Sequence, residues 1–127
     1  MNILYGIQGT GNGHITRSRL LIPSLRKKGF NVDVLLSGRK KDEYWDMECF
    51  RPYDTKFGIT FQVANGTVNK WKTIKKLKLK QFWTDLKSID SKSYDIIITD
   101  YEPISAWAAK KNGILSIGIG HLYSFLY

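Results

Sequence analysis

Short apolar runs alternate with helix-like stretches along this chain. The runs lack the apolar and polar alternation of a half-exposed strand, as is typical of parallel strands that are buried on both faces. They cover residues 2–7, 31–37, 94–100 and 114–120. Stretches with a helical pattern lie at residues 15–28, 72–89 and 103–113. This alternation predicts an α/β fold with a Rossmann-like, doubly wound parallel sheet.

The secondary structure of two segments is not decided by the hydrophobic pattern. In the first helix Pro23 removes a hydrogen bond, so we expect a kink there or an earlier end of the helix. Residues 57–71 combine a β-rich run with the turn pair Asn65-Gly66. They fit either a third strand followed by a loop or a β-hairpin, and we favour the third strand.

Composition restricts the class of protein. With 127 residues and 43% hydrophobic content, the chain is expected to form one domain with a real core. Its 20 Lys and Arg exceed its 11 Asp and Glu, and the net charge of +9 favours an anionic partner. Nucleic acid, a phosphorylated substrate and an acidic membrane surface all fit that description.

The same sequence predicts where the protein resides. Cys49 is the single cysteine, so no intrachain disulfide can form, which fits reducing, cytoplasmic surroundings. The N-terminus has no signal-peptide pattern, and no apolar run approaches the roughly 20 residues that cross a bilayer. We therefore expect a soluble or peripheral protein. No Cys and His pattern predicts a metal site.

Unusual polar residues follow the predicted strands. In an open parallel sheet, ligands bind beyond the carboxyl ends of the strands, where the strand order reverses. The segments at these ends are Gly9–His14, Ser37–Arg39, Asn65-Gly66, Asp100–Glu102 and His121. The glycines of the first segment permit positive φ angles and close approach of a ligand, and the next helix directs its N-terminal N–H groups to the same place. An anion is the expected ligand.

Two nucleotide-binding motifs fit the loop GTGNGH poorly. In the dinucleotide fingerprint Gly-x-Gly-x-x-Gly, the third glycine would occupy the position of His14. The acidic residue expected after the second strand is replaced by Ser37, Gly38 and Arg39, although Arg39 leaves an NADP-like ligand open. A Walker A loop is excluded, because no Gly-Lys-Ser/Thr follows the glycines.

The loop also resembles a known family, the glycosyltransferases of GT-B fold. The stretch YGIQGTGNGHITRS is similar to their first loop and helix, in particular in the peptidoglycan N-acetylglucosaminyltransferase type (family 28-like or family 1-like). It is still more similar to a bacterial and archaeal GT-B branch with Gly-x-Gly-His-x-x-Arg, here Gly11 to Arg17, and Asp-aromatic-Glu-Pro, here Asp100 to Pro103. With FGITFQVANGTVNKWKT between these motifs, the resemblance covers nearly the whole chain.

The resemblance implies that residues 1–127 are the N-terminal, acceptor-binding domain of a GT-B glycosyltransferase, without the C-terminal donor-binding domain. Such an enzyme moves a sugar from a nucleotide-diphosphate donor to an acceptor hydroxyl, and its acceptor is often lipid-linked or anionic. It binds no tight cofactor and needs no metal, because the nucleotide-diphosphate sugar is its donor substrate. The chain alone is expected to be inactive without the missing domain or a partner chain.

Within this resemblance His14 is the expected catalytic base. Transfer to a hydroxyl needs a group that takes the acceptor proton, and imidazole can do so at neutral pH. Alternatively, His14 caps the helix or bonds a neighbouring strand end. The residues expected to contact acceptor or phosphate are Gly9, Thr10, Gly11, Asn12, Gly13 and Arg17.

Other residues at the strand ends are assigned supporting roles. Arg17 faces either the cleft or the solvent. Asp100 and Glu102 either orient His14 or bind acceptor hydroxyls, or they form a helix N-cap before Pro103. His121 is included for its place at a strand end, and a structural role is expected for it.

The stretch KWKTIKKLKLK at residues 70–80 interleaves six lysines with apolar side chains. It fits a solvated helix face, which we favour slightly, or an amphipathic surface that lies on an anionic membrane at its inner, cytoplasmic side. Nucleic acid is not expected as a partner, because no recognised nucleic-acid-binding module accompanies the charge. The alternative to an enzyme part is therefore a non-catalytic basic module that binds an anionic membrane or an NADP-like ligand.

Overall fold

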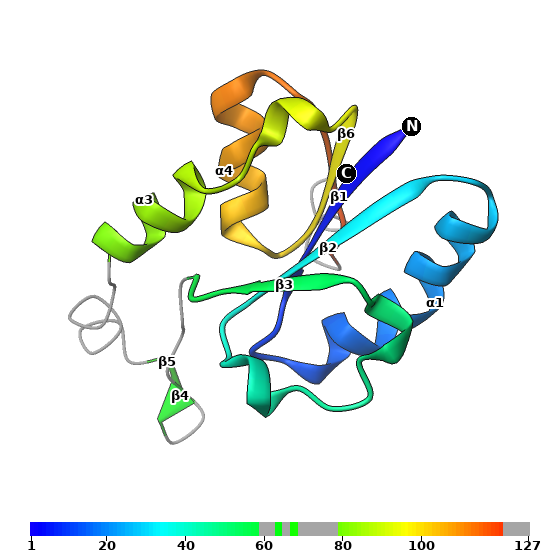
Figure 1. Cartoon of the computed structure of the whole chain (residues 1–127). Coiled ribbons are helices and arrows are strands. Elements are labelled where there is room, and N and C mark those ends of the chain that lie inside the picture. Colours follow the sequence, from blue (N-terminus) through cyan, green and yellow to red (C-terminus); the bar gives the residue numbers. More distant parts are fainter. Residues whose placement is uncertain (59–62, 65–66, 69–78, 121–127) are drawn as a thin grey trace, which may run out of the picture.

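A five-stranded parallel sheet forms the centre of the molecule, in the strand order β3-β2-β1-β6-β7 (Figure 1). The computed structural model describes residues 1–58, 63–64, 67–68 and 79–120. The strands of this sheet are β1 (Asn2–Gln8), β2 (Asn31–Ser37), β3 (Tyr53–Lys56), β6 (Ile96–Asp100) and β7 (Leu115–Gly118). The sheet and its flanking helices confirm the predicted Rossmann-like α/β class.

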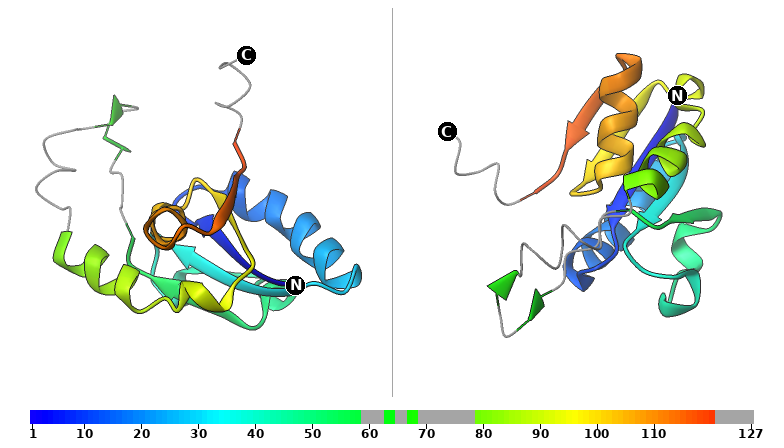
Figure 2. Two further views of the ribbon diagram at one scale, coloured as in Figure 1. Left: turned by 90° about the horizontal axis from the view of Figure 1, so that it is seen from above. Right: turned by 90° about the vertical axis from the view of Figure 1, so that its left-hand side faces the viewer.

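Helices cover both faces of this sheet (Figure 2). On one face lies α1 (Asn12–Lys27), together with the 3-10 turn η2 (Glu48–Phe50). On the other face lies α4 (Pro103–Asn112), and α3 (Leu79–Lys87) packs beside it. Two further 3-10 turns are η1 (Lys41–Glu43) and η3 (Ser91–Ser93).

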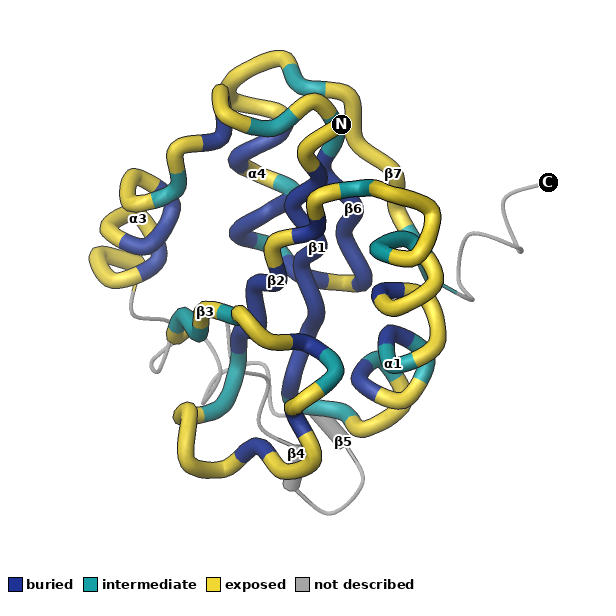
Figure 3. The backbone as a smooth tube through the Cα atoms, turned by 45° about the vertical axis from the view of Figure 1, so that its right-hand side comes forward, coloured by how far each residue is buried: buried dark blue, intermediate teal, exposed yellow. Residues whose placement is uncertain are grey.

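Successive side chains of β1 enter different cores, one on each face of the sheet. Ile3, Tyr5 and Ile7 belong to the core beneath α1, whereas Leu4 packs into the core beneath α4. Figure 3 shows β1 and β6 buried over nearly their whole length. Because both faces are covered, these strands are apolar runs without alternation, which is why the sequence indicates them clearly.

The third strand differs from its prediction. Residues 53–56 form β3 at the sheet edge, and nothing in their sequence, Tyr-Asp-Thr-Lys, indicates a buried strand. Within residues 57–71, the described pairs Val63–Ala64 (β4) and Thr67–Val68 (β5) instead run antiparallel. The preferred interpretation of that segment was therefore wrong, and the hairpin alternative holds. The carboxyl end of the third strand is at Lys56, and Asn65-Gly66 lies outside the described residues.

The first helix is longer than expected at its start. It begins at Asn12, inside the glycine loop, and it continues through Pro23 to Lys27, so an earlier end at the proline was wrong. The guanidinium of Arg26 fixes its last turn by donating to backbone carbonyl oxygens of β2 and of the η2 segment. These acceptors are Val32, Cys49, Phe50 and Arg51, at 2.8–3.3 Å. Gly29 follows with a φ of 88°.

The other predicted elements agree with the structure apart from their bounds. The helix expected at residues 72–89 is present as α3 from Leu79, and residues 69–78 lie outside the described part. The helix before Gly113 is α4, and the glycine adopts a φ of 64° as its C-cap. His121 is also outside the described residues.

The order of the strands reverses between β1 and β6. The chain leaves β1 through α1 toward β2 on one side, and it leaves β6 through α4 toward β7 on the other. The loops after these two adjacent strands therefore diverge, and a ligand site is expected between them. His14, in the first turn of α1, and Asp100, the last residue of β6, lie next to these two loops.

Candidate functional site

His14 and Asp100 meet at the point where the strand order reverses. His14 lies in the first turn of α1, and Asp100 is the last residue of β6. The imidazole Nδ1 is 2.7 Å from Oδ1 of Asp100. The Asp100 side chain is fully buried, whereas that of His14 is 28% exposed, so the pair joins a buried charge to a ring that solvent can reach.

Arg17 is the third member of this cluster. Its Nε donates to Oδ2 of Asp100 at 3.0 Å and its Nη2 donates to Oδ1 at 2.5 Å. Of the two orientations left open by the sequence, Arg17 thus faces Asp100. Hydrogen bonding to the carboxylate raises the pKa of Arg17, whereas partial burial opposes that rise. The fork of the guanidinium binds both oxygens, which is the strong geometry for this pair.

The contact with Asp100 fixes the tautomer of His14. A nitrogen that lies 2.7 Å from a carboxylate oxygen requires a proton between the two atoms, so Nδ1 carries the hydrogen and donates it. Nη2 of Arg17, 3.3 Å from the same Nδ1, is then a close neighbour without a hydrogen bond. In the neutral ring Nε2 keeps its lone pair, and it is available to accept a proton.

Glu102 turns away from this cluster. It is fully buried, and its carboxylate accepts hydrogen bonds from the backbone N–H of Ile104 at 2.9 Å and of Ser105 at 2.6 Å. It therefore forms the N-cap of α4, which was the alternative to a role at His14. Burial raises the pKa of Glu102, and these hydrogen bonds partly oppose the rise.

Tyr101 separates the two acids and is a neighbour that the motif alone did not indicate. Its φ of 58° is left-handed, a conformation that costs a non-glycine residue about 1–3 kcal/mol. Its ring centroid lies 5.4 Å from that of His14, with 46° between the planes. An aromatic residue between two acids at a strand end is the signal that could have drawn attention to it.

The glycine loop forms one wall of the site, but not by the mechanism expected. None of its glycines has a positive φ, and such angles occur at Gly29, Gly38, Gly58 and Gly113 among the described glycines. A side chain at Gly9 would come within 2.1 Å of the Tyr44 hydroxyl oxygen, so Gly9 is required by packing. Gly13, in contrast, faces open space.

The start of α1 has no capping side chain, and the anion that the sequence predicts there stays a prediction. Gly11 is its N-cap, no side chain caps the helix, and no acidic residue occupies its first turn. The neighbouring Thr10 and Asn12 are engaged by Arg39, whose Nη2 donates to the Thr10 carbonyl and to Oδ1 of Asn12 at 3.0 Å each. Free N–H groups at a helix start attract phosphate and carboxylate groups.

In the part of the chain that the structure describes, no group of three or more His, Cys, Asp and Glu side chains is placed to hold a metal ion. None of the helices in that part is both long enough and apolar enough to cross a membrane.

Comparison with known proteins agrees with this architecture. Residues 1–123 match the family described as "Glycosyl transferase family 1". The fold is similar to the crystal structure of Acinetobacter baumannii MurG, with a TM-score of 0.60 and 17% sequence identity, over 98% of this chain and 38% of that one. A search of curated proteins finds no match. The chain thus spans well under half of the solved protein that it resembles, and it has the fold of an N-terminal GT-B domain. By its sequence over nearly its full length, the chain belongs to glycosyl transferase family 1.

Proposed function

We propose that this domain is the acceptor-binding half of a glycosyltransferase that moves a sugar from a nucleotide-diphosphate donor to an acceptor hydroxyl. The observation that carries the proposal is the pairing of the partly exposed His14 with the buried Asp100, beside an uncapped helix start. The cluster lies where α/β sheets bind ligands. Family membership supports the reaction class.

In this proposal His14 removes the proton from the acceptor hydroxyl. Nδ1–H is held by Asp100, so Nε2 accepts the proton as the hydroxyl oxygen attacks the anomeric carbon of the donor. The charge of Asp100 stabilises the imidazolium that forms, as a carboxylate does behind other histidine bases. Arg17 holds the carboxylate in this orientation through both of its oxygens.

The free N–H groups of α1 are assigned to a phosphate. Their partial positive charge suits a phosphate of the acceptor, or the diphosphate that leaves the donor. Gly13 gives such a group access, because no atom apart from its chain neighbours and the backbone of its own helix lies within 4 Å of the place where a side chain would be. No tightly bound cofactor is required, because the nucleotide-diphosphate sugar supplies the group that is transferred.

The donor is assigned to a second domain. This chain covers 38% of the MurG structure, so the proposed reaction needs a donor-binding domain in addition to the residues described here. That domain would be part of the same gene product or of a partner chain. We place the reaction at the cytoplasmic side of the cell.

The test is an assay of nucleotide diphosphate release on the gene product that contains this domain, with a panel of nucleotide sugars. We expect His14→Ala to lower kcat by about 100-fold or more and to change KM little, because proton transfer by a positioned base contributes about that much. Ser24→Ala, which changes an exposed hydroxyl on the same helix, is the matched control. Activity of His14→Ala equal to that of the control would refute the role of His14.

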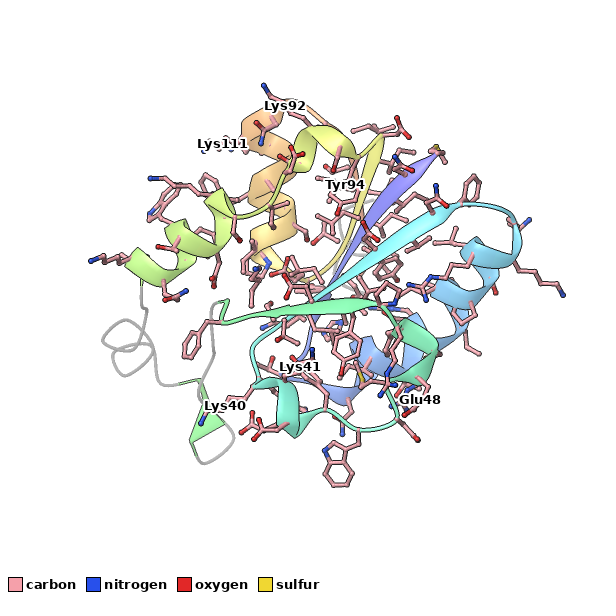
Figure 4. The ribbon with its side chains drawn as sticks, viewed as in Figure 1. Lys40, Lys41, Glu48, Lys92, Tyr94 and Lys111 are labelled. Atoms are coloured by element: carbon pink, nitrogen blue, oxygen red, sulfur yellow. The ribbon has the colours of Figure 1, made fainter. Side chains whose placement is uncertain are left out.

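A second candidate function is contact with an anionic membrane. Trp83 and Trp107, each 46% exposed, lie with ring centroids 6.2 Å apart, and Nζ of Lys110 is 5.5 Å from the centroid of the Trp107 ring. Together with Leu86 and Lys111 they line an apolar hollow of about 390 Å³. Figure 4 shows Lys111 near the last turn of α4, so cations flank this apolar surface. Aromatic rings flanked by lysines suit a headgroup region.

Sedimentation with vesicles tests this candidate. We expect binding to vesicles that contain anionic lipid, a decrease with salt, and a loss in the double variant Trp83→Ala/Trp107→Ala. Trp45→Ala removes an indole that is 80% exposed elsewhere, and it should bind as the unchanged protein does. Equal sedimentation of both variants would refute the membrane surface. Binding of an NADP-like ligand stays a further alternative, and a titration with NADP tests it.

A further inference from the structure

A pocket of about 320 Å³ lies beside the His14 cluster, between the first half of α1 and the connection from β2 to η2. Neither His14, Arg17 nor Asp100 lines it. The polar and aromatic side chains around it are Asn12, Thr16, Arg19, Arg39, Trp45 and Asp46. Its lining is thus distinct from the residues of the cluster.

Two arginines supply the charge of this pocket. Arg39 is held by the carbonyl of Thr10 and by Asn12, and its guanidinium carbon lies 6.0 Å from the centroid of the Tyr44 ring. Nη2 makes both of these hydrogen bonds, which leaves the other side-chain donors of Arg39 without a hydrogen bond within the described ranges. The guanidinium is therefore oriented in advance and can still bind a second, anionic partner.

Arg19 faces the pocket from the helix. Its Nη2 donates to the carbonyl of Trp45 at 3.0 Å. Its Nε is buried and has no hydrogen-bond partner among the residues described, and leaving such a donor unpaired costs about 1–3 kcal/mol. Nη1 of Arg19, for which the described residues provide no hydrogen-bond acceptor, is the donor that an anionic oxygen can bind. Among the described ion pairs, none involves Arg19 or Arg39.

The remaining lining suits a ring that carries hydroxyl groups. The Thr16 hydroxyl donates to the Asn12 carbonyl, so its lone pairs can accept from a ligand. Asp46 is exposed and can accept hydrogen bonds from hydroxyl groups. Trp45 is 80% exposed, and its indole N–H is already bound to the carbonyl of Glu43, which leaves the face of the ring for apolar contact.

We propose that this pocket binds an anionic sugar, with its phosphate or carboxylate group on Arg19 and Arg39 and its ring against Trp45. A guanidinium group can bind either a phosphate or a carboxylate, because each presents two oxygens that accept two parallel N–H···O hydrogen bonds. Figure 4 shows Lys40 and Lys41 on the connection that carries Arg39, where their charge adds to the attraction of an anion. If the proposed transfer reaction holds, the ligand is the charged part of the acceptor, and only this last step rests on that reaction.

Titration calorimetry of the protein with four probes tests the pocket: glucose 6-phosphate, glucuronate, inorganic phosphate and glucose. We expect the two anionic sugars to bind best, inorganic phosphate more weakly, and glucose at least about tenfold more weakly than either anionic sugar. Comparison of glucose 6-phosphate with glucuronate shows whether the pocket prefers a phosphate or a carboxylate group. Glucose that binds as well as the anionic sugars, or no saturable binding of any probe, would overturn the proposal.

Variants assign the binding to the pocket. Arg19→Gln and Arg39→Gln should each weaken binding of glucose 6-phosphate by about tenfold or more, as expected for loss of a charged hydrogen bond. Trp45→Ala should weaken the sugars but leave inorganic phosphate unchanged. Arg51→Gln is the matched control, because Arg51 is 69% exposed and does not line the pocket. An equal loss in the control would show general charge attraction and overturn the site.

Two further measurements separate the outcomes. Thermal melting of each variant shows that it is folded, so that lost binding reports on the ligand. His14→Ala should bind the four probes as the unchanged protein does, because His14 does not line the pocket. Failure of the pocket would leave the effect of His14 on sugar transfer intact, and failure of that reaction would leave the titrations unchanged.

Discussion

Asp100→Asn tests the cluster at the sheet switch point most directly. The carboxylate of Asp100 is fully buried and accepts three hydrogen bonds, two from Arg17 and one from His14. The amide keeps the shape of the side chain but loses its charge. One of its two polar atoms becomes a donor. In the position of Oδ2 it faces Nε of Arg17, and in the position of Oδ1 it faces Nη2 of Arg17 and Nδ1 of His14.

The expected loss of stability follows from these contacts. A hydrogen bond to a charged group contributes about 1.5–3 kcal/mol; in the variant at least one of the three is lost, and the others lose the charge of their acceptor. Arg17 and His14 are 27% and 28% exposed, so water replaces part of each loss. We therefore expect about 2–3 kcal/mol less free energy of unfolding. With an m-value of about 1.5 kcal/mol per M, the urea midpoint falls by about 1–2 M.

Urea unfolding and NMR measure the two consequences separately. Asp54→Asn is the matched control, because the Asp54 carboxylate is 67% exposed and its pair with Lys56 should contribute less than about 1 kcal/mol. The nitrogen shifts of His14 report its tautomer, and the Nδ1–H form should be less populated in Asp100→Asn. A midpoint within the range of the control, together with an unchanged tautomer, would refute the view that Asp100 organises this site.

Three other substitutions address the frame around the site. Burial raises the pKa of Glu102 above 4.5, and a raised carboxyl pKa contributes stability that is present at low pH and is lost as the pH rises through the folded-state pKa. The amide in Glu102→Gln does not titrate, so the free energy of unfolding of this variant should increase relative to that of the unchanged protein from pH 4.5 upward. Urea unfolding at several pH values measures both free energies. A difference between them that does not change with pH would contradict the expectation. Gly6→Ala would place a Cβ 2.1 Å from Oγ of Ser105, and should cost about 1–3 kcal/mol in the same assay, whereas an unchanged midpoint would mean that α4 shifts freely. Arg26→Met removes the donor to four carbonyl oxygens and should lower the melting temperature by about 5–15 °C, for a loss of about 2–4 kcal/mol; a change of less than about 2 °C would contradict a clamping role.

The sequence predicts the inner strands of this fold better than its edge. β1, β2 and β6 are covered on both faces, so their side chains must be apolar and the signal is continuous. β3 has a single neighbouring strand and no fully buried residue, and its four residues therefore carry no hydrophobic pattern. The pair β4 and β5 is two residues long on each side, too short for periodicity to distinguish it from a strand and loop.

The sequence predicts the location of the site, because the ends of the predicted strands indicate the edge of the sheet where it lies. Both His14 and Asp100 follow apolar runs, and the rule for parallel sheets brings such ends to one edge. That they touch depends on β1 and β6 being neighbours, which is set by the strand order and not by any local pattern. The cap formed by Glu102 and the pocket around Arg39 depend on tertiary packing in the same way.

The left-handed conformation of Tyr101 lets one short motif direct two buried carboxyl groups to different hydrogen-bond donors. The residues before and after it are both acids and both fully buried, yet Asp100 faces a guanidinium and Glu102 faces backbone amides of another helix. An extended residue at this position would continue the hydrogen bonding of β6, whereas the positive φ of Tyr101 turns the chain from the sheet toward α4. The turn at Tyr101 thus gives the two carboxyl groups separate sets of hydrogen-bond donors, so that a substitution at one leaves the donors of the other in place.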